Sequence, residues 1–137
     1  SAADLHGVLL APMAVKGVEL IVGVVRDPIF GPVLMCGLGG VLVEVLEDVA
    51  FRSLPITRDD AAGMLAQLRG RALLTGVRGE PPVDREALIE LLLSVSALVG
   101  AYPQIHELDL NPVIAHAGGV TLVDARILLE SCNGDAS

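Results

Sequence analysis

The sequence predicts one α+β domain in which a mainly antiparallel sheet is packed by two helices. Short β-branched runs near both ends of the chain have the alternation of strands, whereas two longer runs between them space their apolar residues as helices do. At 137 residues the chain has room for one domain, residues 1–137, and little room for a second. A hydrophobic content of 53% with 19% charged residues indicates a folded chain with a well-buried core.

The first part of the chain is predicted to form two pairs of strands. Residues 7–13 and 18–25 are apolar runs on either side of a turn, and we expect them to pair. A loop rich in proline and glycine follows, and the runs at 33–36 and 41–49 form the second pair. Glu19 is a lone carboxylate in an apolar strand, which suits a solvated edge and a binding site about equally well.

Three glycines, Gly37, Gly39 and Gly40, separate the strands of the second pair. Such a cluster forms either a tight turn or a loop whose backbone amides face phosphate oxygens. A Walker loop is excluded because no Lys-Ser or Lys-Thr pair follows, and the cluster does not begin a helix as a dinucleotide-binding fingerprint must. The residues alone leave the turn and the phosphate loop both open.

Two helices are predicted, at 58–68 and at about 85–102. Thr57 is a good N-cap for the first helix, and Asp60 stands at the capping-box position three residues later. Asp84 caps the second helix, whose apolar stripe is wider than one face. The second helix must therefore pack against the sheet.

The stretch at 107–112 carries the clearest functional signal. Glu107, Asp109 and Asn111 alternate with two leucines, so in a strand these three oxygen-bearing side chains share one face, and Pro112 ends the run. Carboxylate and amide oxygens are the hard ligands that Mg²⁺ takes alongside nucleotide phosphates.

Asp124 stands late in a second apolar run, 120–124, which follows a hairpin-type turn. Together with the stretch at 107–112, Asp124 predicts one of two arrangements. The first is a divalent-metal site on neighbouring strands, and the second is a polar strand face that carries more acidic than basic residues. The spacing alone does not decide between these two interpretations.

Charge and composition argue against several partners. The net charge is −8 with Lys16 the only lysine, which disfavours binding to a phosphate backbone, and three aromatic residues are too few for base stacking. No apolar run reaches the ~18 residues of a membrane span. Cys36 and Cys132 lie far apart and suit a reducing compartment, so we expect a cytoplasmic protein that binds neither nucleic acid nor membrane.

Taken in order, these motifs resemble the C-terminal part of the ATP-grasp domain of NDP-forming acyl-CoA synthetases, the relatives of succinyl-CoA synthetase and its β subunit. The similarity spans Gly7 to Leu129, and the motifs that carry it lie at 16–23, 27–33, 37–46, 48–52, 107–112 and 123–126. Several motifs in one order are more specific than any single glycine cluster. The resemblance implies a fragment of a longer chain, and we expect the polar residues 131–137 to form a frayed tail.

The resemblance implies Mg²⁺ and ATP as cofactors, bound between two subdomains of which this chain would be the C-terminal one. Asn111 and Asp124 match the Mg²⁺ ligands, and Asp109 holds the accompanying acidic position. Glu107 would be only a neighbour of these ligands.

For the nucleotide, the resemblance implies that a strand at 8–13 reaches the adenine and that the glycine cluster lies near the transferred phosphate. Arg26 or Lys16 would offset the charge of that phosphate. The implied cofactor-binding residues are Val8, Leu10, Met13, Glu19, Arg26, Gly37, Gly39, Gly40 and Arg126.

The implied function is the Mg-ATP half-site of an NDP-forming acid–CoA ligase that acts through phosphoryl transfer. In that family ATP phosphorylates a histidine presented by another part of the enzyme, and the phosphate then passes to an acid on its way to acyl-CoA. The phosphate-clamping lysine of the preceding subdomain is missing, so we expect no turnover by the isolated chain. Its partners would be the remaining ATP-grasp subdomain and the CoA-binding domains, or a second copy in a homodimer.

A second interpretation is a non-catalytic regulatory or dimerisation module of a synthetase-like protein, such as a protein acetyltransferase. Retention of Asp109, Asn111 and Asp124 favours the ligase. Ala11, where the family usually has Gln or Glu, and the missing N-terminal half favour the module.

Overall fold

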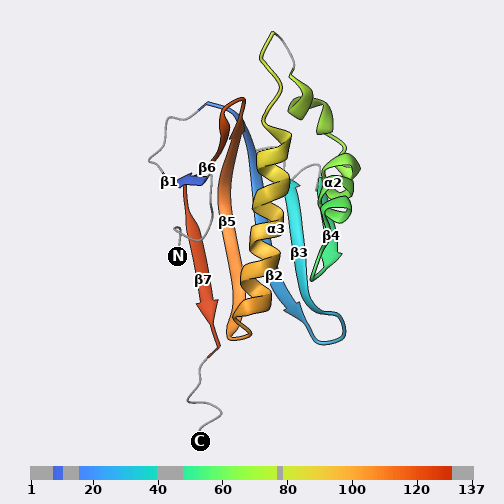
Figure 1. Ribbon diagram of the computed structural model, residues 1–137, viewed down its shortest axis with the longest axis vertical. Coiled ribbons are helices and arrows are strands. Elements are labelled where there is room, and N and C mark those ends of the chain that lie inside the picture. The colour runs from blue at the N-terminus through green and yellow to red at the C-terminus, as the bar shows by residue number, and fades with distance from the viewer. Residues whose placement is uncertain (1–7, 11–15, 40–47, 77–78, 131–137) are drawn as a thin grey trace, which may run out of the picture.

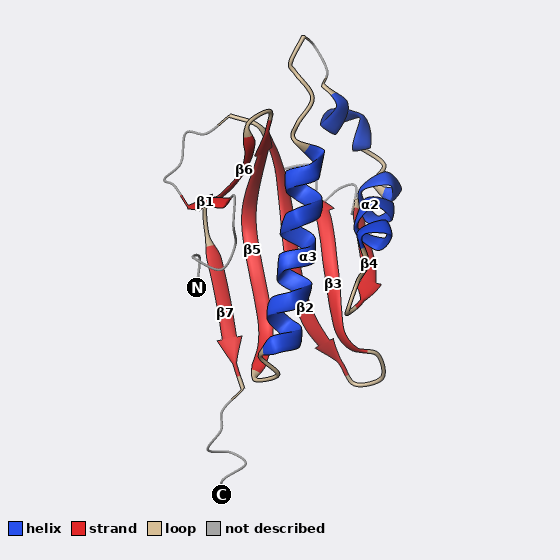
Figure 2. Ribbon diagram, viewed as in Figure 1, coloured by secondary structure: helices blue, strands red, loops and turns tan. Residues whose placement is uncertain are grey.

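The structure is a computed structural model that describes residues 8–10, 16–39, 48–76 and 79–130. These residues form one seven-stranded sheet with two α-helices on one of its faces (Figure 1 and Figure 2). The arrangement confirms the predicted α+β class, a mainly antiparallel sheet packed by two helices. No helix in these ranges is long and apolar enough to cross a membrane.

The sheet is built around one long strand, β5. Its first half lies between β2 and β7, and its second half lies between β2 and β6. The full order is β1-β6-β5-β2-β3-β4, with β7 paired to β5 alone (Figure 1). The strands are β1 (Val8–Leu10), β2 (Val18–Asp27), β3 (Gly31–Leu38), β4 (Val49–Ser53), β5 (Ile105–His116), β6 (Gly119–Leu122) and β7 (Ala125–Leu129).

β1 does not pair with β2, so the predicted pairing of residues 7–13 with residues 18–25 is wrong. β1 instead runs parallel to β6, with Val8 opposite Val120 and Leu10 opposite Leu122. The physical reason is that both edges of β2 are occupied, one by β3 and the other by β5. Residues 7 and 11–13 of the predicted strand lie outside the described part of the chain.

β4 is a strand that the sequence did not predict. The expected strand at 41–49 falls almost entirely outside the described residues, and only Asp48 and Val49 of it are placed. In β4, Ala50 is fully buried while Phe51 beside it is 55% exposed. One small buried side chain gives little apolar alternation, so the usual sequence signal for a strand is absent here.

β5 continues past Pro112, which was predicted to end the strand. Leu110 pairs with Val22, but the next pair joins Val113 to residue 20, so Asn111 and Pro112 together oppose one residue of β2. This is a β-bulge, where proline is tolerated because the extra residue does not need to donate to the ladder.

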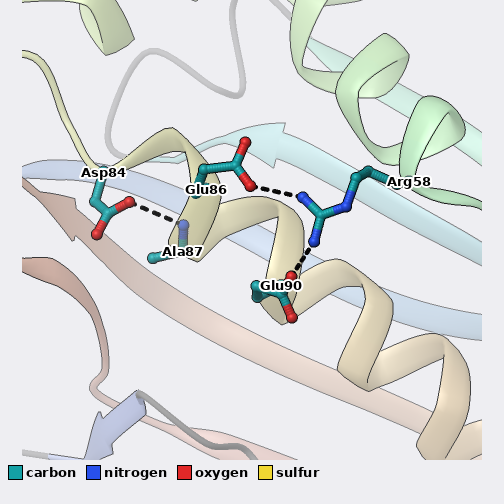
Figure 3. Close-up of polar contacts among 5 residues, drawn as sticks. All are labelled: Arg58, Asp84, Glu86, Ala87 and Glu90. Atoms are coloured by element: carbon teal, nitrogen blue, oxygen red, sulfur yellow. Dashed lines mark hydrogen bonds and ion pairs between the residues drawn. The ribbon is translucent and has the colours of Figure 1, made fainter.

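Both predicted helices are present, with the predicted caps. α2 spans Arg58–Gln67 and α3 spans Arg85–Ala101, and a short 3₁₀ helix, η2 (Arg71–Thr75), lies between them. Asp60 N donates to Thr57 Oγ1 (3.1 Å) and Thr57 N donates to Asp60 Oδ2 (2.9 Å), which is the expected capping box. Asp84 Oδ1 accepts from Ala87 N at 3.0 Å where α3 begins (Figure 3).

The two faces of the sheet differ in what covers them. One face, which we call the covered face, packs under α2 and α3, and the core residues on it are at most 3% exposed: Leu20, Val22, Val24, Leu34, Cys36, Leu108 and Leu110. Burial raises the pKa of the Cys36 thiol to about 12. The other face, which we call the open face, carries the alternate residues of the same strands. No helix of the described residues covers it (Figure 1).

Candidate functional site

Gly23 lies at the centre of the open face. In the register of the sheet it stands beside Met35 of β3 on one side and Asp109 of β5 on the other, and Asp109 in turn faces Arg126 of β7. Directly paired residues project from the same face of a sheet. A Cβ atom on Gly23 would lie 3.9 Å from Asp109 Oδ1 and 3.8 Å from Met35 Cε. Because Gly23 has no side chain, the space next to the Asp109 carboxylate stays open.

Asn111 and Asp124 meet two positions further along the same ladder. The pair Asp109–Arg126 is followed by Leu110–Ala125, and then Asn111 N donates to the Asp124 carbonyl oxygen at 3.2 Å. Cβ atoms of opposite residues are about 5 Å apart and diagonal ones about 7 Å apart in such ladders. The structure therefore brings together four predicted site residues, Asp109, Asn111, Asp124 and Arg126, which we call the β5–β7 cluster.

Asp124 lies in the bend between β6 and β7, and not at the end of a strand over 120–124 as predicted. β6 ends at Leu122 because the chain then crosses beside the bulge, where Val123 N donates to the Pro112 carbonyl oxygen at 3.1 Å. Asp124 Oδ1 accepts from Ala125 N at 2.9 Å, and the Asp124 side chain is exposed. The bend therefore turns this carboxylate toward solvent beside Asn111.

The donor atoms of the β5–β7 cluster suit a hard divalent cation. Asp109 is half-buried and Asn111 is exposed, and no side-chain hydrogen bond to another described residue occupies either of them. In the described ranges no group of three or more His, Cys, Asp or Glu side chains is placed to hold a metal. A cation would therefore need the Asn111 amide oxygen beside the two carboxylates. Mg²⁺ fits such a set because it takes one or two protein carboxylates and completes its shell with water or phosphate oxygens.

Two of the predicted glycines lie across β2 from this cluster. Gly37 pairs with Ile21, the residue that the bulge opposes on the other side, so the glycine and the bulge are two strands apart, about 10 Å. A Cβ on Gly37 would lie 2.6 Å from Val49 Cγ1, so packing against β4 explains this glycine. Gly39 N donates to the Glu19 carbonyl oxygen at 2.8 Å. Gly40 lies outside the described residues, so the choice between a turn and a phosphate loop stays open.

Other predicted residues lie apart from the cluster or outside the described ranges. Arg26 is at the far end of β2, where its Nε and Nη2 donate to the carbonyl oxygens of Ile105 and Pro103, each at 2.9 Å. It therefore holds the loop that precedes β5. Val8 and Leu10 form β1 beside β6, the strand that leads into Asp124, and Met13 is not described.

Asp48 is a structural residue that sequence reasoning missed. Its side chain is 3% exposed, and its carboxylate accepts from the backbone N–H groups of Arg69 (2.6 Å) and Gly70 (2.7 Å). A Cβ on Gly70 would lie 2.4 Å from Leu38 Cδ1 and 3.2 Å from Asp48 Oδ2, so a larger residue here would displace the Leu38 side chain and crowd the Asp48 carboxylate. Gly70 follows a helix, and a glycine there could have indicated a close contact with Asp48. A glycine at that position is also common simply because many helices end with one.

The histidines described by the structure have structural contacts or lie away from the cluster. His116 Nε2 lies 3.0 Å from Thr121 Oγ1, and its Nδ1 accepts from Gly118 N at 3.2 Å, so it holds the hairpin between β5 and β6. His106 is exposed near the start of β5. His6 lies outside the described residues.

The sequence is similar to a known protein family and to several CoA ligases. A family model described as an ATP-grasp domain matches residues 1–129. The β subunit of ADP-forming acetate–CoA ligase I from Pyrococcus furiosus is 46% identical over 127 residues, which cover 93% of this chain and 55% of that subunit. ADP-forming acetate–CoA ligase I from Archaeoglobus fulgidus is 49% identical, with 93% of this chain and 18% of that protein covered.

A solved structure agrees with these matches. Dinucleotide-forming acetyl-coenzyme A synthetase 1 from Ca. Korarchaeum cryptofilum, in complex with coenzyme A and Mg-AMPPCP, has a TM-score of 0.81 and 48% identity, and the match covers 86% of this chain and 55% of that chain. This chain thus spans about half the length of the β subunits and a smaller share of the longer ligases that it matches. These relatives are named as CoA ligases or synthetases, which favours the ligase prediction over the regulatory module.

Proposed function

Because the chain belongs to the ATP-grasp domain family, as its motifs predicted, we propose that it supplies the Mg-nucleotide half-site of an ADP-forming acyl-CoA synthetase. The observation that carries this proposal is the β5–β7 cluster, which sets two carboxylates, an amide and a guanidinium in alternate pairs of the ladder, on the open face. Phosphoryl transfer needs such a set more than it needs a nucleophile, because most of the catalysis is positioning and charge stabilisation.

In this proposal Asn111 and Asp124 are the principal Mg²⁺ ligands and Asp109 is the third. These residues would hold Mg²⁺ beside the nucleotide phosphates, where the metal would supply neutralisation of negative charge. Arg126 projects from the same face beside Asp109 and offers N–H donors to the phosphates. Gly23 keeps the space beside Asp109 clear of a side chain.

The open face also suggests where the remaining subdomain would sit. Val25, Phe51 and Leu128 project from this face and are 52%, 55% and 54% exposed. Burial of these side chains by the other half of an ATP-grasp domain would exclude water from the polar centre between them. We therefore propose that the phosphate-clamping cation comes from that half and that the phospho-accepting histidine comes from another part of the enzyme. No turnover by the isolated chain, a cytoplasmic location and a homodimer stay predictions.

The metal site can be tested with Mn²⁺, a paramagnetic substitute for Mg²⁺, added with ATP to the ¹⁵N-labelled chain. We expect amide signals of residues 109–111 and 124–126 to broaden before the rest of the spectrum, even if the affinity is weak. The Asp124→Asn and Asn111→Ala variants should lose this selective broadening. The matched control is Asp59→Asn, which removes an exposed carboxylate from the first turn of α2.

A different pattern would contradict the proposal. Broadening that spreads evenly over the acidic surface, or that survives in Asp124→Asn as it does in Asp59→Asn, would show that the cluster holds no cation. ADP-forming activity of the whole protein should then also be insensitive to the Asp124→Asn substitution.

A further inference from the structure

A pocket of about 460 Å³ lies in the helix layer, away from the open face. Its lining residues come from the second half of α2, from the link to η2, from η2 itself and from the first residue of α3. Leu65 and Leu74 line it and are 1% and 5% exposed, so its floor is apolar. Three arginines also line it, namely Arg69, Arg71 and Arg85.

Hydrogen bonds to α2 and to its C-cap residue, Leu68, fix two of the three guanidinium groups. Arg71 Nη1 donates to the Leu68 carbonyl oxygen at 3.1 Å, and Arg85 Nη2 donates to the Ala62 carbonyl oxygen at 3.3 Å. Those carbonyl groups are six residues apart, about 9 Å along the helix axis. Each guanidinium has five N–H donors in a planar fork, so both arginines keep donors for a ligand between them. Arg69 is exposed, and its guanidinium has no hydrogen-bond partner among the described residues.

The positive charge of this pocket is not balanced by described carboxylates. The chain has a net charge of −8 and only nine Lys and Arg residues, yet three of the nine line this one pocket. The ion pairs found in the described ranges join Arg58 to Glu86 and Glu90 and use none of these three arginines (Figure 3). The Asp48 carboxylate lies near Arg69, but it is buried and accepts from backbone N–H groups. The end of a helix contributes about half a negative charge, against three from the guanidinium groups.

We propose that this pocket is a second anion site, which binds the phosphate group of a small organic phosphate. Phosphate oxygens match the planar fork of arginine, and a doubly charged phosphate offsets more of the local charge than a carboxylate does. The apolar floor formed by Leu65 and Leu74 accommodates the organic part of the ligand. The volume lies within the range of about 300–1,000 Å³ that small-molecule sites occupy.

The test uses phenyl phosphate and inorganic phosphate as probes, with EDTA present so that binding does not depend on a metal. Titrations are followed through the amide signals and the arginine Nε–Hε signals of the ¹⁵N-labelled chain. We expect saturable shifts of Arg69, Arg71 and Arg85 and of residues 65–75, with phenyl phosphate binding several-fold more tightly than inorganic phosphate. The Asp124→Asn variant should bind both probes as the unmodified chain does, so this result is separable from the fate of the proposed nucleotide site.

Arg69→Gln is the decisive variant because the Arg69 guanidinium makes no hydrogen bond to the part of the chain that the structure describes. It should weaken phenyl phosphate binding several-fold while the melting temperature stays unchanged. The matched control is Arg58→Gln, which removes the same charge from an exposed ion pair outside the pocket. Arg85→Lys keeps the charge and loses the planar fork, so it should also bind more weakly.

Three outcomes would overturn the proposal. The first is the absence of saturable shifts, which would mean that the arginines serve only to hold α2. The second is an equal loss of binding in Arg58→Gln and Arg69→Gln, which would mean that the probes respond to overall charge. The third is equal binding of the two probes, which would exclude a role for the apolar floor.

Discussion

On β5, Leu108 and Leu110 point into the core and are 3% and 2% exposed, while Asp109 between them projects from the open face. On β2 the same contrast holds, because Val22 and Val24 are buried and Gly23 between them has no side chain. The covered face thus supplies the apolar burial that holds the fold, and the open face carries the polar residues. A period of two lets neighbouring residues of one strand serve these separate requirements. Substitutions on the two faces should therefore have separable effects.

The strongest test of this separation compares Leu110→Ala with Asp109→Asn. Leu110→Ala removes buried methyl groups and leaves a cavity, so it should lower the free energy of unfolding by about 2–5 kcal/mol. Asp109→Asn keeps the shape of a partly exposed side chain and should change it by less than about 1 kcal/mol. Urea unfolding followed by circular dichroism measures both. Equal losses of stability would show that Asp109 is part of the structural core.

Asp48 provides the next largest effect, because it is a polar residue buried on the side of the helices. Asp48→Ala would leave the N–H groups of Arg69 and Gly70 without their acceptor, at a cost of about 1–3 kcal/mol in unfolding free energy. Asp59→Ala removes an exposed carboxylate of the same type and serves as the control. If both variants unfolded at the same urea concentration, the Asp48 contacts would contribute nothing to the fold.

Gly23→Val should disturb the open face more than the core. A Cβ at residue 23 would lie 3.3 Å from the Leu108 carbonyl oxygen and 3.9 Å from Asp109 Oδ1, so the two methyl groups of a valine would crowd the Asp109 carboxylate. We expect selective Mn²⁺ broadening of residues 109–111 to weaken, with a change in unfolding free energy of no more than about 1 kcal/mol. Val25→Thr is the control, since it alters an exposed residue of the same face and strand. Unchanged broadening in Gly23→Val would mean that Asp109 needs no clear space.

The sequence predicted the locally determined parts of the fold best. Both helices were found because their caps, Thr57 with Asp60 and Asp84, act within a few residues of the chain. The partner of β1 could not be found this way, since β6 lies more than 100 residues further along the chain and the apolar run at 18–25 is a much nearer pairing partner in the sequence. Apolar patterning says that a strand is half-buried but does not say which edge it joins.

In the candidate site, too, the sequence predicted the local features and missed those that depend on tertiary structure. Alternation placed Asp109 and Asn111 on one face, because the strand period of two depends only on local geometry. The sequence does not predict the bulge, because a proline usually ends a strand, although a bulge is a place where a strand admits proline. The contact of Asn111 with Asp124 depends on that bulge and on β7 pairing with β5, which are tertiary features. Arg26 was predicted to lie near the nucleotide phosphate because of its charge. In the structure its N–H groups instead donate to backbone carbonyl groups where the loop before β5 ends.

The smallest expected effect concerns the cap of α2, which lies on the covered side. The backbone N–H of Thr57 and then its hydroxyl lower the pKa of the Asp60 carboxyl below its ordinary value of 3.8. A carboxyl group whose pKa is lower in the folded state adds stability above its unfolded-state pKa, and this contribution is lost as the pH falls through the folded-state value. Asp60→Asn should therefore have a lower melting temperature than the unmodified chain at pH 7, and the difference should shrink below about pH 4.

Asp59→Asn is the matched control, because Asp59 lies in the same first turn of α2 but outside the capping box. Both substitutions remove a negative charge near the helix N-terminus, so the electrostatic effect of the helix end is common to both. The additional loss in Asp60→Asn then measures the cap alone. Melting curves recorded by circular dichroism between pH 3 and pH 7 would contradict this account if the two variants melted together at every pH. In that case the stability of the helix layer would come from apolar packing of Ala61, Met64 and Leu65 without help from the cap.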